Sequence, residues 1–206
     1  MSTTTKQKII KSKERVRDLA EVFTSEREVN AMLDLGMIKY LSENIDNTLL
    51  EPSCGNGNFL LAILKRKLDT VKAKYKKQED FEFYIMKAVA SIYGIDISEE
   101  NISEARERMF IEVKNFYSYK LNTKKAGEGF WDSVQWILNN NVIVGDMLNK
   151  IEDVILVEYT TPKKYYFKRQ EFRLADQLKN KKTLDTLFAE QLPLKSYKIT
   201  NYLKLC

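Results

Sequence analysis

Apolar and polar residues follow two different spacings along this chain, and the spacings predict a mixed α/β fold. Several long segments carry apolar residues at the spacing of a helix with one buried face. Short unbroken apolar runs lie between them and are typical of buried parallel strands. The predicted helices cover residues 15–23, 26–44, 59–77, 81–89 and 98–110, and the predicted strands end at or near Leu50, Ile97, Val144 and Val157. Strands that alternate with helices favour a Rossmann-like parallel sheet with helices on both faces.

Other segments give less regular signals. Ser25 and Glu28 form a capping-box pattern at the start of the second helix. Residues 111–141 are aromatic-rich and predict a loop and a short helix, which either cover a cofactor edge or pack on the sheet. Residues 163–174 alternate charged and aromatic side chains like a hairpin strand, and Thr183 to Leu205 predicts a short helix and an extended tail.

A glycine-containing segment joins the first predicted strand to the next helix. Its sequence is Leu49-Leu50-Glu51-Pro52-Ser53-Cys54-Gly55-Asn56-Gly57-Asn58-Phe59-Leu60. Pro52 stops the strand, and Gly55 and Gly57 permit backbone torsions and close approaches that other residues forbid. The first N–H groups of the following helix then face the loop, where they favour an anionic group. The segment is either an ordinary strand-to-helix turn or a cofactor site, and the neighbouring motifs favour the cofactor site.

Asp96 follows the second predicted strand. A carboxylate at that end of a parallel strand lies over the crevice of the sheet, where it can accept hydrogen bonds from two vicinal ribose hydroxyls. The alternative is that Asp96 only terminates the strand. The glycine segment before it favours the binding role.

Four segments, taken in order, resemble class I S-adenosylmethionine-dependent DNA methyltransferases that methylate adenine N6, as in restriction-modification systems. The glycine segment resembles the cofactor loop of this family, and Glu21 to Val29 resembles the segment whose Phe-Thr pair closes over the methionine end of the cofactor. Tyr93 to Ser98 and Val142 to Leu148 resemble the second and third strands, whose acids lie near the ribose and the adenine amino group. The resemblance covers residues 14–157 and implies cofactor contacts from Phe23, Thr24, Glu51, Pro52, Ser53, Gly55, Gly57, Asn58, Phe59, Asp96, Ile97, Asp146 and Met147.

The catalytic motif of that family is missing. Its fourth strand ends in Asn/Asp-Pro-Pro-Tyr/Phe, whereas residues 153–157 here are followed by Glu158-Tyr159-Thr160-Thr161-Pro162. Glu158 and Tyr159 are the candidate catalytic residues, as a rearranged polar and aromatic pair. Losing the rigid turn and the stacking ring should lower adenine methylation severely. The chain is therefore expected to be weak or inactive alone. Two alternatives remain: the chain is an accessory or regulatory subunit completed by a partner, or it is a methyltransferase that uses Glu158 on another substrate.

Composition narrows the chemistry further. The 206 residues include no histidine and two cysteines, which excludes Ser–His and Cys–His catalysis and leaves too few ligands for a structural zinc site, so no metal is expected. Cys54 is interpreted as a small residue in a tight loop. No signal peptide, membrane span or disulfide framework is apparent, and we expect a cytoplasmic protein. The formal net charge of +5 is a mild bias toward anionic partners such as DNA.

We expect a flexible basic N-terminus over residues 1–13 and a single domain over 14–206. Within that domain, residues 14–47 form a helical cofactor cover, 48–157 the cofactor-binding core and 158–206 a basic and aromatic extension. The strand over residues 163–174 is expected to be an exposed sheet edge, which its lysines and arginines protect or which binds DNA, a protein partner or a second copy of the chain.

Overall fold

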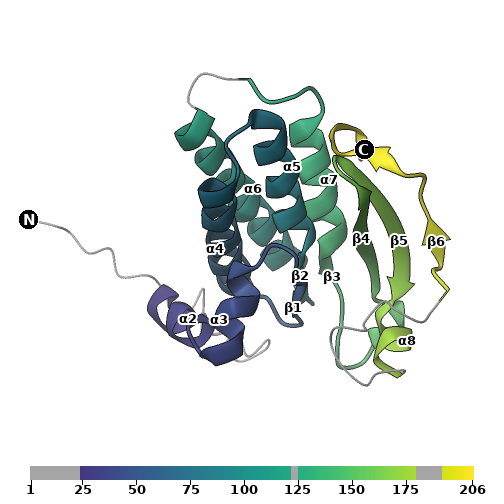
Figure 1. Cartoon of the computed structure of the whole chain (residues 1–206). Helices are drawn as coiled ribbons and strands as arrows, with labels where there is room; N and C mark the ends of the chain where they lie inside the picture. The colour runs from purple at the N-terminus through teal and green to yellow at the C-terminus, as the bar shows by residue number, and fades with distance from the viewer. Residues whose placement is uncertain (1–23, 122–124, 180–191) are drawn as a thin grey trace, which may run out of the picture.

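The computed structural model describes residues 24–121, 125–179 and 192–206, and within them a three-stranded parallel sheet organises the chain (Figure 1). The strand order is β1-β2-β3, with Leu50 opposite Tyr93 and Ile95 opposite Ile143. Two helices join each consecutive pair of strands. The bounds are β1 Leu49–Glu51, α4 Asn58–Lys74, α5 Gln78–Ala90, β2 Ile92–Asp96, α6 Glu99–Leu121, α7 Phe130–Asn141 and β3 Val142–Val144. The fold is thus mixed α/β with a parallel sheet, which is compatible with a Rossmann-like fold.

The two faces of this sheet have different covers. Leu49, Ile92 and Val142 belong to the large core that contains the buried residues of α4, α5, α6 and α7. Because strands that follow one another in sequence are also neighbours in space, right-handed crossovers place all four helices on one face. The opposite face carries Tyr93 and Ile95, which pack against residues that follow β3. The prediction of helices on both faces is therefore wrong, because long helices cover only one face of this sheet among the described residues.

A second, antiparallel sheet follows the first. It contains β4 Ile155–Lys163, β5 Tyr166–Arg173, β6 Lys195–Ser196 and β7 Thr200–Asn201. The predicted fourth strand exists, but it pairs with β5 in a hairpin and does not join the parallel sheet. A strand that lies two residues away along the chain is an easier partner than a distant one, and Tyr165, with φ of 70°, makes the tight turn.

The expected open edge at residues 163–174 is wrong. The hairpin strand forms as predicted, but the chain returns along its outer side, where β6 and β7 both pair with β5. Tyr202 then inserts into the main core, and its hydroxyl donates to the buried Glu82 Oε2 at 2.9 Å. The returning tail therefore supplies the backbone partners that the sequence alone left unassigned.

Two short helices precede β1 where one helix over residues 26–44 was predicted. They are α2 Glu26–Leu33 and α3 Gly36–Glu43. The capping box of Ser25 and Glu28 is confirmed at the start of α2. Asp34 and Leu35 separate the helices, and Gly36, with φ of +38°, begins α3. Arg66 of α4 donates to the carbonyl oxygens of Leu33 and Asn30 and so fastens this helical pair to the core.

A buried lysine fixes the turn that leads into β1. Lys67 lies in α4 with no exposed surface, and its Nζ donates to the carbonyl oxygens of Asn44 and Asn47 at 3.0 and 2.5 Å. It also donates to the Ser91 hydroxyl at 2.7 Å, just before β2. One ammonium group thus ties together the starts of both strands.

Several shorter elements complete the described chain. They are η1 Ile151–Asp153, α8 Leu174–Lys179 and η3 Tyr202–Lys204. Residues 111–141 are more helical than predicted, because α6 continues to Leu121 and α7 begins at Phe130. The helix expected after Thr183 lies mostly outside the described residues, as do residues 1–23. No helix in the described part of the chain combines the length and the apolar character needed to cross a membrane.

Candidate functional site

Three loops meet at the carboxyl ends of β1, β2 and β3, and backbone hydrogen bonds join them. Cys54 N donates to Ile95 O at 2.9 Å, which links the glycine loop to the end of β2. Gly145 N donates to Asp96 O at 2.9 Å, which links the end of β2 to the loop after β3. The predicted acids and glycines therefore lie along one edge of the sheet, where open α/β sheets bind ligands.

The glycine loop requires its glycines. Gly55 and Gly57 have φ of 51° and 86°, in the left-handed region that disfavours other residues. A Cβ on Gly57 would also lie 2.9 Å from the Ala105 Cβ, so α6 leaves no room for a side chain. Gly57 is the N-cap of the 17-residue helix α4, and no side chain caps that end. The N–H groups of the first turn are therefore directed at the loop, as an anion site requires.

Asp96 organises the loop. Its side chain is 9% exposed, its Oδ2 accepts from Gly55 N at 2.9 Å and its Oδ1 accepts from Ser98 N at 2.9 Å. Asn101 Nδ2 lies 3.4 Å from the same Oδ1. A carboxylate has about four acceptor positions, so these contacts leave room for about one further donor. Asp96 thus shapes the glycine loop in addition to facing the crevice.

A hollow of about 280 Å³ lies between the loops after β2 and β3, and its lining includes Ile97, the residue that follows Asp96. Its lining residues are Ile97, Val144, Gly145, Asp146, Lys150, Asp153 and Val154. Ile97 and Val144 are 59% and 49% exposed, which is high for branched aliphatic side chains at the ends of buried strands. The apolar walls can cover a flat ring, and the carboxylates at the rim can accept from its amino groups.

Asp146 lies at this rim but turns partly into its own loop. Its Oδ1 accepts from the backbone N–H groups of Leu148 and Asn149 at 3.0 and 2.9 Å. Hydrogen bonds from Asn149 lower the pKa of the Asp146 carboxyl. The neighbouring Met147 packs against the small core on the second face of the sheet and does not line the hollow.

The first half of the glycine segment combines a half-buried acid with a buried thiol. Burial raises the pKa of Glu51, while a hydrogen bond from the Ser53 backbone opposes the shift. Pro52 and Ser53 are exposed in the turn. Burial, with the nearby Asp96 and Glu51 charges, raises the pKa of Cys54 to about 12. A thiol held in its neutral form is a poor nucleophile, which agrees with the interpretation of Cys54 as a small packing residue.

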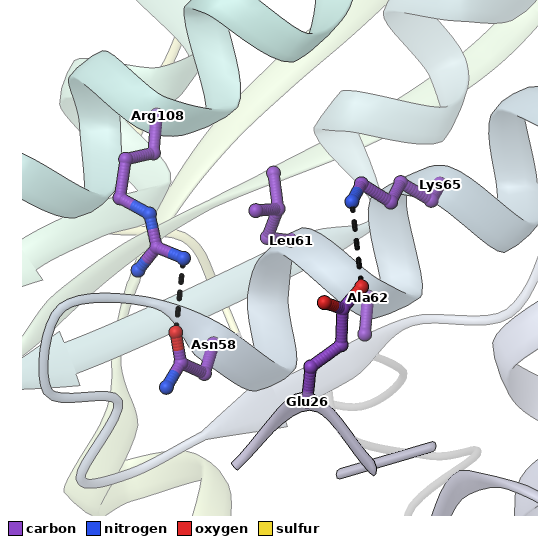
Figure 2. Close-up of a pocket in the computed structure, with 6 residues that line it drawn as sticks. All are labelled: Glu26, Asn58, Leu61, Ala62, Lys65 and Arg108. Carbon is purple, nitrogen blue, oxygen red and sulfur yellow. Dashed lines mark hydrogen bonds and ion pairs between the residues drawn. The ribbon is translucent and has the colours of Figure 1, made fainter. Parts of the chain in front are cut away.

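A second hollow of about 180 Å³ lies among α2, α4 and α6 (Figure 2). Its lining residues are Glu26, Asn58, Leu61, Ala62, Lys65 and Arg108. Asn58 was predicted at the cofactor site, but its side chain donates to the carbonyl oxygen of Thr24 at 2.9 Å and accepts from Arg108. Phe59 packs on the main core, and Phe23 lies outside the described residues.

Glu158 and Tyr159 occupy neighbouring positions of β4 on opposite faces of its sheet. The Tyr159 ring contacts Trp136 and Phe167 edge to face, and its buried hydroxyl has no hydrogen-bond partner among the described residues. Burial raises the pKa of Glu158, and the Lys168 charge opposes the shift. Neither side chain lines the two hollows described above. Their catalytic role stays a prediction.

Sequence reasoning assigned no binding role to five of the residues that line the larger hollow. These are Val144, Gly145, Lys150, Asp153 and Val154. Gly145 could have been found, because it precedes Asp146 and a Cβ there would lie 3.0 Å from Ile95 Cγ2. Among the described residues, no cluster of three or more potential metal ligands occurs.

Comparison with known proteins places the chain in no family. No family model matches the sequence, and neither the curated proteins nor the solved structures contain a match. Its function must therefore be argued from the site.

Proposed function

We propose that this chain binds S-adenosylmethionine at the carboxyl edge of β1, β2 and β3, as a protein similar to the DNA adenine N6-methyltransferases. The observation that carries the proposal is the junction of Gly55 N with the Asp96 carboxylate, together with an apolar hollow whose lining includes the next residue, Ile97. That junction places a helix N-terminus, an acid and an apolar slot at one edge of the sheet. An adenosyl group joined to an amino acid offers matching anionic, hydroxyl and aromatic parts.

Each part of this ligand has a chemically suitable partner. The N–H groups at the start of α4 suit the carboxylate of the methionine end. Asp96 can accept from one ribose hydroxyl, and the hollow with walls of Ile97 and Val144 suits the adenine ring. When bound, the cofactor supplies a methyl group on a positively charged sulfur. This chain would hold and orient that group.

Methyl transfer to DNA by the isolated chain should be absent or very slow. The parallel sheet has no fourth strand among the described residues, and β4 pairs in the other sheet. Tyr159 packs against the rings of Trp136 and Phe167 and does not line the hollow. These observations favour the second candidate function, in which the chain is an accessory or regulatory subunit completed by a partner protein.

Calorimetric titration tests cofactor binding directly. We expect S-adenosylmethionine and S-adenosylhomocysteine to bind the wild-type chain, whereas free methionine, which lacks the adenosyl group, should bind far more weakly. Val144→Glu places a charge in the wall of the hollow and should abolish binding. Ile111→Glu is the matched control, because Ile111 is a similarly exposed aliphatic residue, on α6 and 46% exposed, that does not line the hollow. Equal affinity in both variants would remove the hollow from the site.

A transfer assay separates the two candidate functions. The chain is incubated with cofactor labelled on the methyl group and with unmethylated DNA, RNA or protein. We expect binding without turnover. Robust adenine methylation that Glu158→Gln abolishes would refute the accessory role and make Glu158 the catalytic group.

A further inference from the structure

Arg108 of α6 holds the glycine loop at Asn56 and Asn58, whereas Asp96 holds it at Gly55. Its Nη1 donates to the Asn56 carbonyl oxygen at 2.6 Å, and its Nη2 donates to Asn58 Oδ1 at 2.9 Å. Figure 2 shows the guanidinium directed at the Asn58 amide across the smaller hollow. One side chain therefore bonds to residues on both sides of Gly57.

Two further contacts extend this arrangement. One turn earlier on α6, Glu104 Oε1 accepts from Asn56 Nδ2 at 2.7 Å. The amide nitrogen of Asn58 donates to the Thr24 carbonyl oxygen at 2.9 Å, just before α2 begins. A continuous set of hydrogen bonds thus runs from α6 through the glycine loop to the segment before α2.

The loop needs such restraint because glycine has the largest conformational freedom of any residue. Asn56 lies between two glycines with positive φ, and the direction of its carbonyl sets the orientation of the Asn56–Gly57 peptide group, which includes the Gly57 N–H. A planar guanidinium forms two hydrogen bonds of fixed mutual geometry, which a flexible ammonium does not reproduce. Arg108 is thus suited to select one loop conformation.

We propose that Arg108 is a positioning residue. It holds the N–H groups of the glycine loop in their binding conformation and, through Asn58, couples the loop to the segment that leads into α2. The effect of Arg108 on the order of the loop can be measured in the ligand-free protein. The effect on ligand affinity rests on the proposed function.

Hydrogen exchange of the ligand-free protein, followed by NMR, tests the positioning role. The probes are the amides of Gly55 and Gly57, which donate to Asp96 Oδ2 and Cys54 O. Arg108→Met should speed their exchange by about tenfold, the factor for one ordinary hydrogen bond. Arg108→Lys should give an intermediate rate, and it decides the question if the Met variant does not fold.

Arg106→Met is the matched control. Arg106 is also on α6, and its guanidinium donates to the carbonyl oxygens of Val142 and Asn139 at 2.6 and 3.0 Å, away from the glycine loop. It should leave Gly55 and Gly57 exchange unchanged. Unchanged exchange in both Arg108 variants, or an equal rise in the Arg106 variant, would overturn the proposal.

The coupling through Asn58 has its own variant. Asn58→Asp keeps an oxygen acceptor for Arg108 but removes the donor to Thr24, and an acid suits the first turn of α4. The thermal midpoint should hold or rise, while amides at the start of α2 exchange faster. Unchanged exchange there would refute the coupling.

Affinity measurements then connect the arrangement to function. If the wild type binds S-adenosylmethionine, Arg108→Met should weaken that binding by about tenfold, as expected when a loop must order on binding. Loss of loop protection without any cofactor binding by the wild type would refute the proposed function and leave the positioning role intact. Full affinity despite faster exchange would separate loop order from binding and overturn the functional part of this inference.

Discussion

Replacing Asp96 by Asn tests both roles of the site, because it removes one carboxylate oxygen while keeping the shape of the side chain. The two oxygens now accept from Gly55 N and Ser98 N at 2.9 Å each. The Asn side chain can satisfy one of these donors, and its NH₂ group then faces the other. Losing a hydrogen bond to a charged group costs about 1.5–3 kcal/mol, so the thermal midpoint of a chain of this length should fall by about 3–12 °C.

The same change should weaken cofactor binding by at least about tenfold, which corresponds to about 1.4 kcal/mol. Calorimetry gives the affinity and scanning fluorimetry gives the thermal midpoint. Asp132→Asn is the control, because it makes the same charge change in the first turn of α7, outside the three loops. Unchanged affinity would remove Asp96 from the ligand contacts, and an unchanged midpoint would refute its role in shaping the glycine loop.

Three further predictions concern buried groups. Burial lowers the pKa of Lys67 to about 7, whereas unfolding returns it to about 10.4. Between these two pH values, unfolding is accompanied by the uptake of a proton. The free energy of unfolding should therefore rise from pH 7 to 9, by up to about 1.4 kcal/mol per pH unit. Lys67→Met should flatten this pH dependence, which urea titrations measure. In the native protein at pH 7.5 a thiol reagent should modify the exposed Cys206 rapidly and the buried Cys54 only on unfolding; fast reaction of both would contradict the burial of Cys54. Tyr159→Phe removes a hydroxyl without a partner, so stability to urea should hold or rise by about 1 kcal/mol, and a loss would indicate an interaction of that hydroxyl in solution.

Local sequence patterns predicted the positions of the site loops well. Gly57 and Asp96 lie where the strand and helix signals placed them, because backbone torsion and strand termination are properties of a few neighbouring residues. The capping box at Ser25 was predictable for the same reason. Local chemistry therefore located the edge of the sheet that carries the candidate site.

Long-range partners were less predictable. The apolar run before Glu158 resembles a parallel strand, yet its pairing depends on which distant segment competes for it, and the hairpin partner wins. The continuation of α6 to Leu121 was missed although Val113 and Tyr117 keep the helical spacing, because the nearby aromatic residues suggested a loop. The roles of Arg108 and Lys67 depend on contacts with residues 20 to 52 positions away, which no local pattern contains.

The outer edge of β1 also bears on how the protein avoids self-association. Leu49 N donates to Ser91 O, and the alternation of a parallel ladder then turns the N–H and C=O of Leu50 away from β2. An unpaired edge of this kind is a template for aggregation when it is long and flat. Here β1 has three residues, and Pro52 follows it at once and has no N–H to offer. An intruding strand would find one outward-facing residue to pair with, so the open edge of this sheet carries a low risk of amyloid-like growth.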